Sequence, residues 1–91
     1  MAKLIVFHME RCPNCPLAKK VARKVAEELG LEYQEIDVEE DMITALQYSV
    51  ASTPSIALEF DGKAEVLFRS EVPDEKELRE AVERLLGTQE A

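Results

Sequence analysis

Residues 3–38 contain three successive patterns that together leave few folds open. The apolar run over residues 3–8, after one lysine, is typical of a strand covered on both faces. Residues 13–29 repeat apolar side chains at helical spacing, and residues 32–38 alternate as a half-exposed edge strand does. A strand, a helix and a second strand in this order predict a right-handed crossover between parallel strands.

The helix expected over residues 13–29 has one apolar stripe and a glycine stop. We expect the stripe to face the core, and it consists of Leu17, Val21, Val25 and Leu29, with Ala18, Ala22 and Ala26 beside them. Gly30 follows the last apolar position, where a residue in the left-handed region commonly ends a helix.

The second half of the chain predicts a short helix, a hairpin and a final helix. Asp41 is the expected cap of the short helix, and its expected inward side chains are Met42, Ile43, Leu46 and Val50. Asp61-Gly62 favours a tight turn between strands over residues 56–60 and 63–69. Asp74 and Glu77 form a capping-box start for the final helix. We expect that helix to bury Leu78, Val82, Leu85 and Leu86 and to end at Gly87.

Length and charge limit the classes of protein that fit. Ninety-one residues suit one domain, expected over residues 1–87, with residues 88–91 as a frayed tail. A net charge of −8 argues against binding to nucleic acid, which depends on lysine and arginine. Neither a membrane span nor a signal peptide is evident, so we expect a cytoplasmic monomer that binds no membrane.

The only two cysteines, Cys12 and Cys15, stand where the first strand ends and the helix begins. Two thiols at this spacing can close into a disulfide and open again when another thiolate attacks. If Cys12 is the helix N-cap and Pro13 the first helical residue, the Cys12 sulfur faces the positive end of the helix. The backbone N–H groups of Asn14 and Cys15 then point at it, and Arg11 adds a cation. This placement favours Cys12 as the nucleophile and Cys15 as the more buried resolving thiol.

Other uses of the pair stay open at this point. A structural zinc needs about four ligands, and His8 is the only histidine, so a carboxylate or a second subunit would have to complete the site. A structural disulfide across so short a loop removes little chain entropy. The cations Lys19, Lys20, Arg23 and Lys24 and the acidic stretch over residues 27–41 are either solvated faces or a charge asymmetry that orients a redox partner.

Two segments in this order of elements resemble the motifs of the thioredoxin fold in its compact form, which glutaredoxins and small thioredoxin-like proteins share. They are Cys12-Pro13-Asn14-Cys15 and, about forty residues later, residues 48–56 around Thr53-Pro54. The resemblance implies an α/β protein with the order β-α-β-α-β-β-α and a four-stranded mixed sheet flanked by helices. It also implies that Pro54 is cis and lies against the cysteine pair, and that the Thr53 backbone pairs with a substrate chain.

The activity that the resemblance implies is that of a thiol–disulfide oxidoreductase acting on protein disulfides. Cys12 and Cys15 are its catalytic residues, and Thr53, Pro54, Pro13, Asn14 and Arg11 its substrate-binding residues. No cofactor or metal is expected, and a thiol reductase or glutathione would restore the dithiol. Two alternatives remain: a glutathione-coupled glutaredoxin, and a non-enzymatic module that binds a metal or a partner through the C-x-x-C pair.

The sequence also departs at identifiable positions from the families that it resembles. Arg11 and Val6 stand where larger thioredoxins carry a tryptophan and a buried aspartate, which leaves proton transfer to solvent, His8 or Glu10. Glutaredoxins carry a Gly-Gly pair and an aspartate for glutathione after the hairpin. This chain has Ser70 and Glu71 there, and only Asp74 matches, so an extra carboxylate disfavours the anionic tripeptide.

Overall fold

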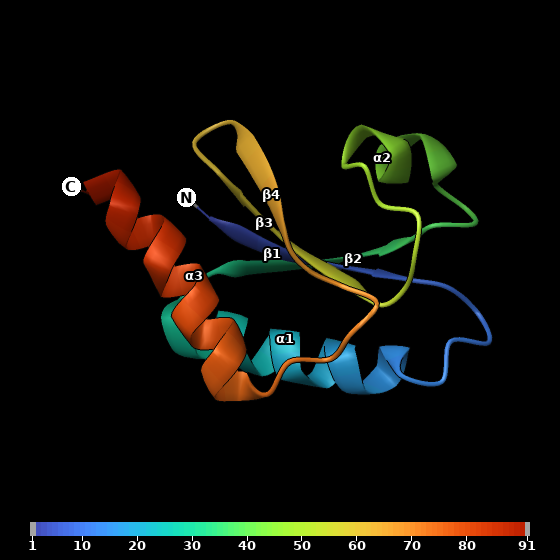
Figure 1. The fold of residues 1–91 in the computed structure, drawn as a ribbon, viewed down its shortest axis with the longest axis horizontal. Helices are drawn as coiled ribbons and strands as arrows, with labels where there is room; N and C mark the ends of the chain where they lie inside the picture. The colour runs from blue at the N-terminus through green and yellow to red at the C-terminus, as the bar shows by residue number, and fades with distance from the viewer. Residues whose placement is uncertain (1, 91) are drawn as a thin grey trace.

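The computed structural model describes the backbone of residues 2–90 and the side chains of residues 2–87. Its elements are β1 (Lys3–His8), α1 (Cys15–Leu29), β2 (Glu32–Asp37), α2 (Met42–Gln47), β3 (Ser55–Phe60), β4 (Lys63–Arg69) and α3 (Glu75–Glu90). The strands form one sheet in the order β2-β1-β3-β4, in which only the β1–β2 pair is parallel. Helices α1 and α3 cover one face and α2 covers part of the other (Figure 1). The predicted order of elements and the mixed, helix-flanked sheet are confirmed.

The core consists of two clusters separated by the sheet. On one face, Leu4 and Val6 of β1 pack with side chains of α1 and α3. On the other face, Ile5 and Phe7 pack with a smaller set under α2. Because β1 is central and covered on both sides, all four side chains are fully buried, which explains the unbroken apolar run.

Helix α1 begins at Cys15, two residues later than predicted, and Asn14 is its N-cap in place of Cys12. The cause is Pro16, which has no N–H to donate to the Cys12 carbonyl. That carbonyl instead accepts a hydrogen bond from the Cys15 N–H at 3.3 Å, which forms a turn ahead of the helix. Gly30 ends α1 in the left-handed region with φ 68°, as predicted.

The buried stripe of α1 also differs from the prediction at its start. Leu17 is 53% exposed, because steps of four residues drift around a helix that repeats every 3.6. The buried positions of the helix are Cys15, Ala18, Val21, Ala22, Val25 and Ala26. In the first turn of α1, Cys15 and Ala18 are therefore buried and Leu17 is not.

The prediction for the inward face of α2 was wrong at three of four residues. Met42, Ile43 and Leu46 are exposed, and Val50 alone of the expected set is buried. The helix has only six residues, and Ala45 is its one buried side chain. Because alanine is small, it lets the α2 backbone lie close to the sheet while the larger side chains point outward.

The turn and caps of the second half agree with their sequence signals. Asp61 and Gly62 both have positive φ, as a tight hairpin between β3 and β4 requires. Asp74 Oδ1 accepts a hydrogen bond from the Glu77 N–H at 2.8 Å, and Glu77 Oε1 accepts one from the Asp74 N–H at 3.1 Å. Helix α3, however, does not end at Gly87 as predicted but continues to Glu90. Residues 88–90 are thus helical in backbone, and Ala91 lies outside the described residues.

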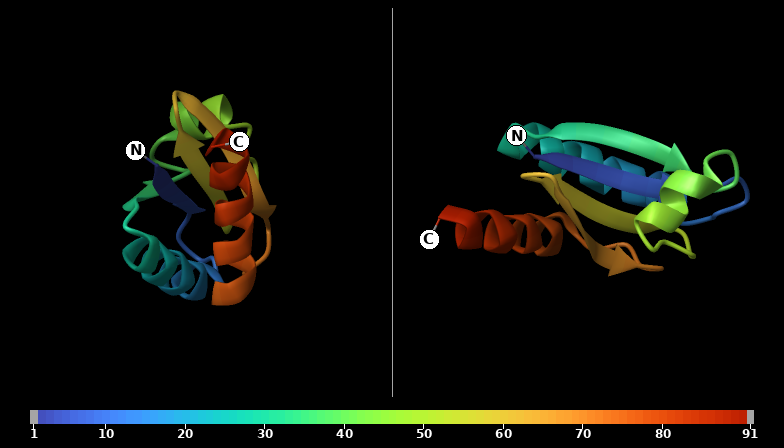
Figure 2. Two further views of the ribbon diagram at one scale, coloured as in Figure 1. Left: turned by 90° about the vertical axis from the view of Figure 1, so that its left-hand side faces the viewer. Right: turned by 90° about the horizontal axis from the view of Figure 1, so that it is seen from above.

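The segments that bear on the chemistry meet at one edge of the sheet, the edge formed by the ends of strands rather than by an outer strand. Strands β1 and β2 finish there and β3 begins there, because β1 is parallel to β2 and antiparallel to β3. In the view from above, α2 lies over this end of the sheet, and the loop from β1 to α1 passes beside it (Figure 2). The cysteine motif and the Thr53-Pro54 segment therefore leave the sheet at the same edge.

Candidate active site

The loop between β1 and α1 presents the cysteines after a sharp reversal. Arg11 makes this reversal with φ 64°, in the left-handed region that a side chain with a Cβ seldom adopts. Its own side chain is exposed, as are those of Pro13 and Asn14. The sequence predicted Arg11 as a nearby cation, and the structure adds a conformational role that no residue pattern signalled.

Cys12 and Cys15 form a disulfide, with their Cα atoms 5.4 Å apart. The two residues differ in access to solvent. Cys12 is half-buried in the loop, whereas Cys15 is 2% exposed on the inner side of α1. An external thiolate or disulfide can therefore reach Cys12, while Cys15 is accessible chiefly to Cys12 itself.

Thr53 and Pro54 lie at the start of β3, and their peptide bond is cis, as the resemblance implied. Phe7 pairs with Ser55 across the β1–β3 ladder, so Pro54 stands beside the end of β1 from which the cysteine loop departs. Pro54 is buried, and Thr53 is half-buried. The register thus brings the two predicted motifs to the same sheet edge, although they are about forty residues apart.

Three hydrogen bonds hold the segment before β3 in place. Ser55 Oγ donates to the Ser52 carbonyl at 2.8 Å, and the Ser70 N–H donates to the Pro54 carbonyl at 2.9 Å. The Arg69 guanidinium reaches the Ser49 carbonyl at 2.6 Å. These three contacts could not be predicted from the sequence, because their acceptors are backbone carbonyls, which every residue type carries.

The proposed proton-transfer groups lie at the same edge. His8 is half-buried at the end of β1 and pairs in register with Asp37 of β2, and Glu10 is exposed in the loop. Hydrogen bonds from the backbone N–H groups of Glu39 and Glu40 lower the pKa of Asp37, and the nearby His8 lowers it further. Asp37 therefore stays ionised beside His8.

A polar network ties α1 to β2 further from the cysteines. Burial raises the pKa of Glu35, but the hydrogen bond from Tyr33 and the charges of Lys19 and Arg23 outweigh it, so the pKa falls below its usual value. Burial, and then the bond to Glu35, raise the pKa of Tyr33. Lys24 pairs with Glu75 of α3 at 3.4 Å. Most of the cation cluster in α1 thus forms ion pairs within the molecule.

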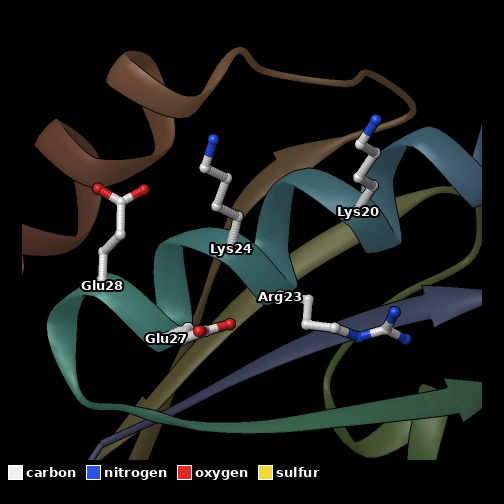
Figure 3. Close-up of a pocket in the computed structure, with 5 residues that line it drawn as sticks. All are labelled: Lys20, Arg23, Lys24, Glu27 and Glu28. Carbon is white, nitrogen blue, oxygen red and sulfur yellow. The ribbon is translucent and has the colours of Figure 1, made fainter.

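A cavity of about 530 Å³ lies along the outer side of α1, away from the cysteine pair. Its lining residues are Lys20, Arg23, Lys24, Glu27 and Glu28. Figure 3 shows that the amino groups of Lys20 and Lys24 lie apart from each other, that of Lys24 on the side of α3, and that the Arg23 guanidinium points away from both. Mixed charges that diverge in this way do not converge on a ligand.

The residues considered for glutathione and metal binding have other surroundings. Asp74 caps α3, and the Ser70 N–H is bonded to Pro54, so neither group faces a ligand freely. Among the side chains of residues 2–87, no three His, Cys, Asp or Glu residues gather as they would around a metal ion. Within the part of the chain that the structure describes, no helix combines the length and apolar character needed to cross a membrane.

Comparison with known sequences gives a consistent result. A family model described as a thioredoxin domain matches residues 2–83. A probable thioredoxin from Archaeoglobus fulgidus is 36% identical over 92 residues, which cover 99% of this chain and 96% of the relative. A thioredoxin from Methanocaldococcus jannaschii is 34% identical over 61 residues, covering 65% of this chain and 72% of the relative.

Solved structures agree with the sequence matches. A mutant thioredoxin from Halobacterium salinarum has a TM-score of 0.81 and 27% identity, over 91% of this chain and 73% of that chain. Thioredoxin 1 from Thermosipho africanus has a TM-score of 0.80 and 19% identity, over 98% and 99% of the two chains, and it supports the fold alone. On the family model, the full-length relative and the position of the cysteine pair, this chain belongs to the thioredoxin domain family.

Proposed function

We propose that this thiol–disulfide oxidoreductase reduces protein disulfides with Cys12 as nucleophile and Cys15 as resolving thiol. The Cys12 thiolate attacks one sulfur of the substrate, which forms a mixed disulfide and releases one substrate thiolate. The Cys15 thiolate then attacks the Cys12 sulfur, which closes the Cys12–Cys15 disulfide and releases the second substrate thiolate. Two electrons pass from the chain to the substrate, and an external dithiol returns them.

The observation that carries these roles is the difference in exposure between the two cysteines. The first step needs a sulfur that a foreign disulfide can approach, and Cys12 is the accessible one. The second step is intramolecular, so its nucleophile can be buried, as Cys15 is. Arg11, which precedes Cys12 in the chain, adds a positive charge that favours the Cys12 thiolate.

Substrate binding is assigned to the surface around Cys12. Three exposed residues flank the half-buried Cys12 and can contact a bound substrate: Arg11, Pro13 and Asn14. Thr53 stands ahead of β3 at the same edge, where its backbone groups can pair with a substrate chain as an added strand. Pro54 has no N–H, so it does not compete for that pairing.

We propose that a group at this edge of the sheet accepts the proton from the buried Cys15 thiol. Val6 of β1 supplies no carboxylate. His8 is the only histidine in the sequence, and it lies at the end of β1 beside the ionised Asp37. Glu10 in the loop and solvent are the other candidates. We also expect a monomer in the cytoplasm, where thiols are kept reduced and a C-x-x-C pair can return to the dithiol after each reaction.

The source of electrons separates this function from that of a glutaredoxin. We expect a thioredoxin reductase with NADPH to reduce the disulfide at least about tenfold faster than glutathione does, because Glu71 and the engaged Asp74 disfavour an anionic tripeptide. The measurement compares insulin reduction driven by the reductase with hydroxyethyl-disulfide reduction driven by glutathione. A glutathione rate equal to or above the reductase rate would assign the chain to the glutaredoxins.

A further inference from the structure

We propose that the groove beside α2 binds the segment of a substrate protein that flanks its disulfide, and that this segment carries a large apolar side chain next to lysine or arginine. The inference rests on the proposed function, since it names the class of substrate for the same cysteine pair. Its evidence is independent of the cysteines and comes from shape, exposure and charge.

The groove has a buried floor and exposed apolar walls. Its volume is about 220 Å³, and it is lined by Val38, Met42, Ala45, Leu46, Val50 and Ala51. Ala45 and Val50 form the floor, at 4% exposure each. Met42 and Leu46 stand above them at 63% and 73% exposure. A leucine-sized side chain placed between these walls would lose most of its contact with water.

The exposed walls are not needed to complete the core. Four large apolar side chains are exposed among residues 2–87, and three of them, Met42, Ile43 and Leu46, belong to the six-residue α2. The cluster beneath α2 is already closed by Ala45, Val50 and the side chains of β1 and β3. Concentration of exposed apolar side chains in one short element marks an interaction surface.

Charge around the groove selects the partner. Glu39, Glu40 and Asp41 immediately precede Met42 and are all exposed. No lysine or arginine occurs from residue 25 to residue 62. The Arg69 guanidinium, which donates to the Ser49 carbonyl, sets one positive charge against these three carboxylates, so the balance stays negative. An acidic rim attracts a basic segment. It repels a second copy of this chain, whose net charge is −8.

The position of the groove identifies the occupant as substrate. Ala51 lies two residues before Thr53, a distance of at most about 7 Å along an extended chain. Val38 also lines the groove, and its N–H donates to the His8 carbonyl at 2.9 Å, so this side of the groove adjoins the end of β1. A substrate chain paired with Thr53 reaches the groove within a few residues of its reacting cysteine.

The test uses the full-length Cys15→Ser variant, in which Cys12 reacts once. Three peptides each carry one cysteine as a mixed disulfide with thionitrobenzoate. Near that cysteine, one has two leucines between lysines, one has two serines between lysines, and one has two leucines between glutamates. Attack by Cys12 joins its sulfur to the peptide sulfur and releases coloured thionitrobenzoate, which gives the rate. A small thionitrobenzoate disulfide without a peptide measures the intrinsic reactivity of Cys12.

We expect the peptide with leucine and lysine to react about tenfold faster than either other peptide at low salt, after division by the rate for the small disulfide. Adding Leu46→Ser should remove the advantage of leucine over serine. Ile43→Ser is the matched control, since Ile43 is equally exposed on α2 but does not line the groove. Adding Glu39→Gln and Glu40→Gln should remove the preference for lysine. Glu80→Gln with Glu83→Gln, which changes the net charge equally on α3, should retain it.

Equal rates for the three peptides would overturn the proposal. So would equal losses in the Leu46→Ser and Ile43→Ser variants, because general stickiness of α2 would then explain the preference. Loss of reaction with the small disulfide would instead contradict the role of Cys12. The two failures are therefore distinguishable.

Discussion

Replacement of Cys12 by serine is expected to reduce insulin-disulfide reduction to the background rate of the assay. A hydroxyl in place of the thiol cannot form the mixed disulfide, and Cys15, at 2% exposure, is not accessible to a protein disulfide. The fold should survive, because Cys12 lies in a half-buried turn outside the core clusters. Turbidity from released insulin chains, measured with a constant supply of reductant, gives the rate.

Cys15→Ser is the matched control for this change. Here the first attack remains possible and the second does not, so we expect a stable mixed disulfide between Cys12 and the substrate. Mass spectrometry under non-reducing conditions detects that adduct. Reduction that persists without Cys12, or an adduct that forms at Cys15 in the Cys12→Ser variant, would reverse the two roles.

Phe7→Ala is expected to lower the free energy of unfolding by about 3–5 kcal/mol. Phe7 is fully buried in the central strand, and its ring centroid lies 5.3 Å from that of Tyr48. The cluster on its face of the sheet is the smaller of the two, so few side chains can move into the cavity. For a domain of this size the loss is a large part of the total stability. Urea unfolding followed by circular dichroism measures it.

Leu46→Ala provides the comparison for Phe7→Ala, because it shortens a side chain of α2 that is 73% exposed. We expect a change within about 0.5 kcal/mol. A loss below about 1 kcal/mol for Phe7→Ala, or similar losses for the two variants, would mean that Phe7 does not support the segment around Tyr48 and Val50.

The sheet could be predicted from the sequence because buried strand positions carry apolar residues and tight turns carry residues that tolerate positive φ. The apolar run of β1 follows from its central position, and the Asp61-Gly62 pair follows from the positive φ that the hairpin requires at both residues. The cysteine motif could also be located from the sequence, since Cys12 and Cys15 are the only two thiols in the chain.

The rest depended on interactions that residue type does not reveal. Pro16 delayed the start of α1 by removing one donor, an effect of hydrogen bonding rather than of apolar spacing. In α2, apolar side chains at helical spacing suggested a buried face, yet a six-residue helix buried only Ala45. The bonds from Arg69 and Ser70 to backbone carbonyls near Pro54 join distant segments and could be found only in three dimensions.

The most direct measurement for this account is alkylation of the reduced protein with iodoacetamide across a range of pH, with each cysteine followed by mass spectrometry. Cys12 is expected to react first at every pH tested, and Cys15 is expected to be modified only after denaturation, because Cys15 is 2% exposed. Equal rates at the two cysteines, or faster reaction at Cys15, would contradict it.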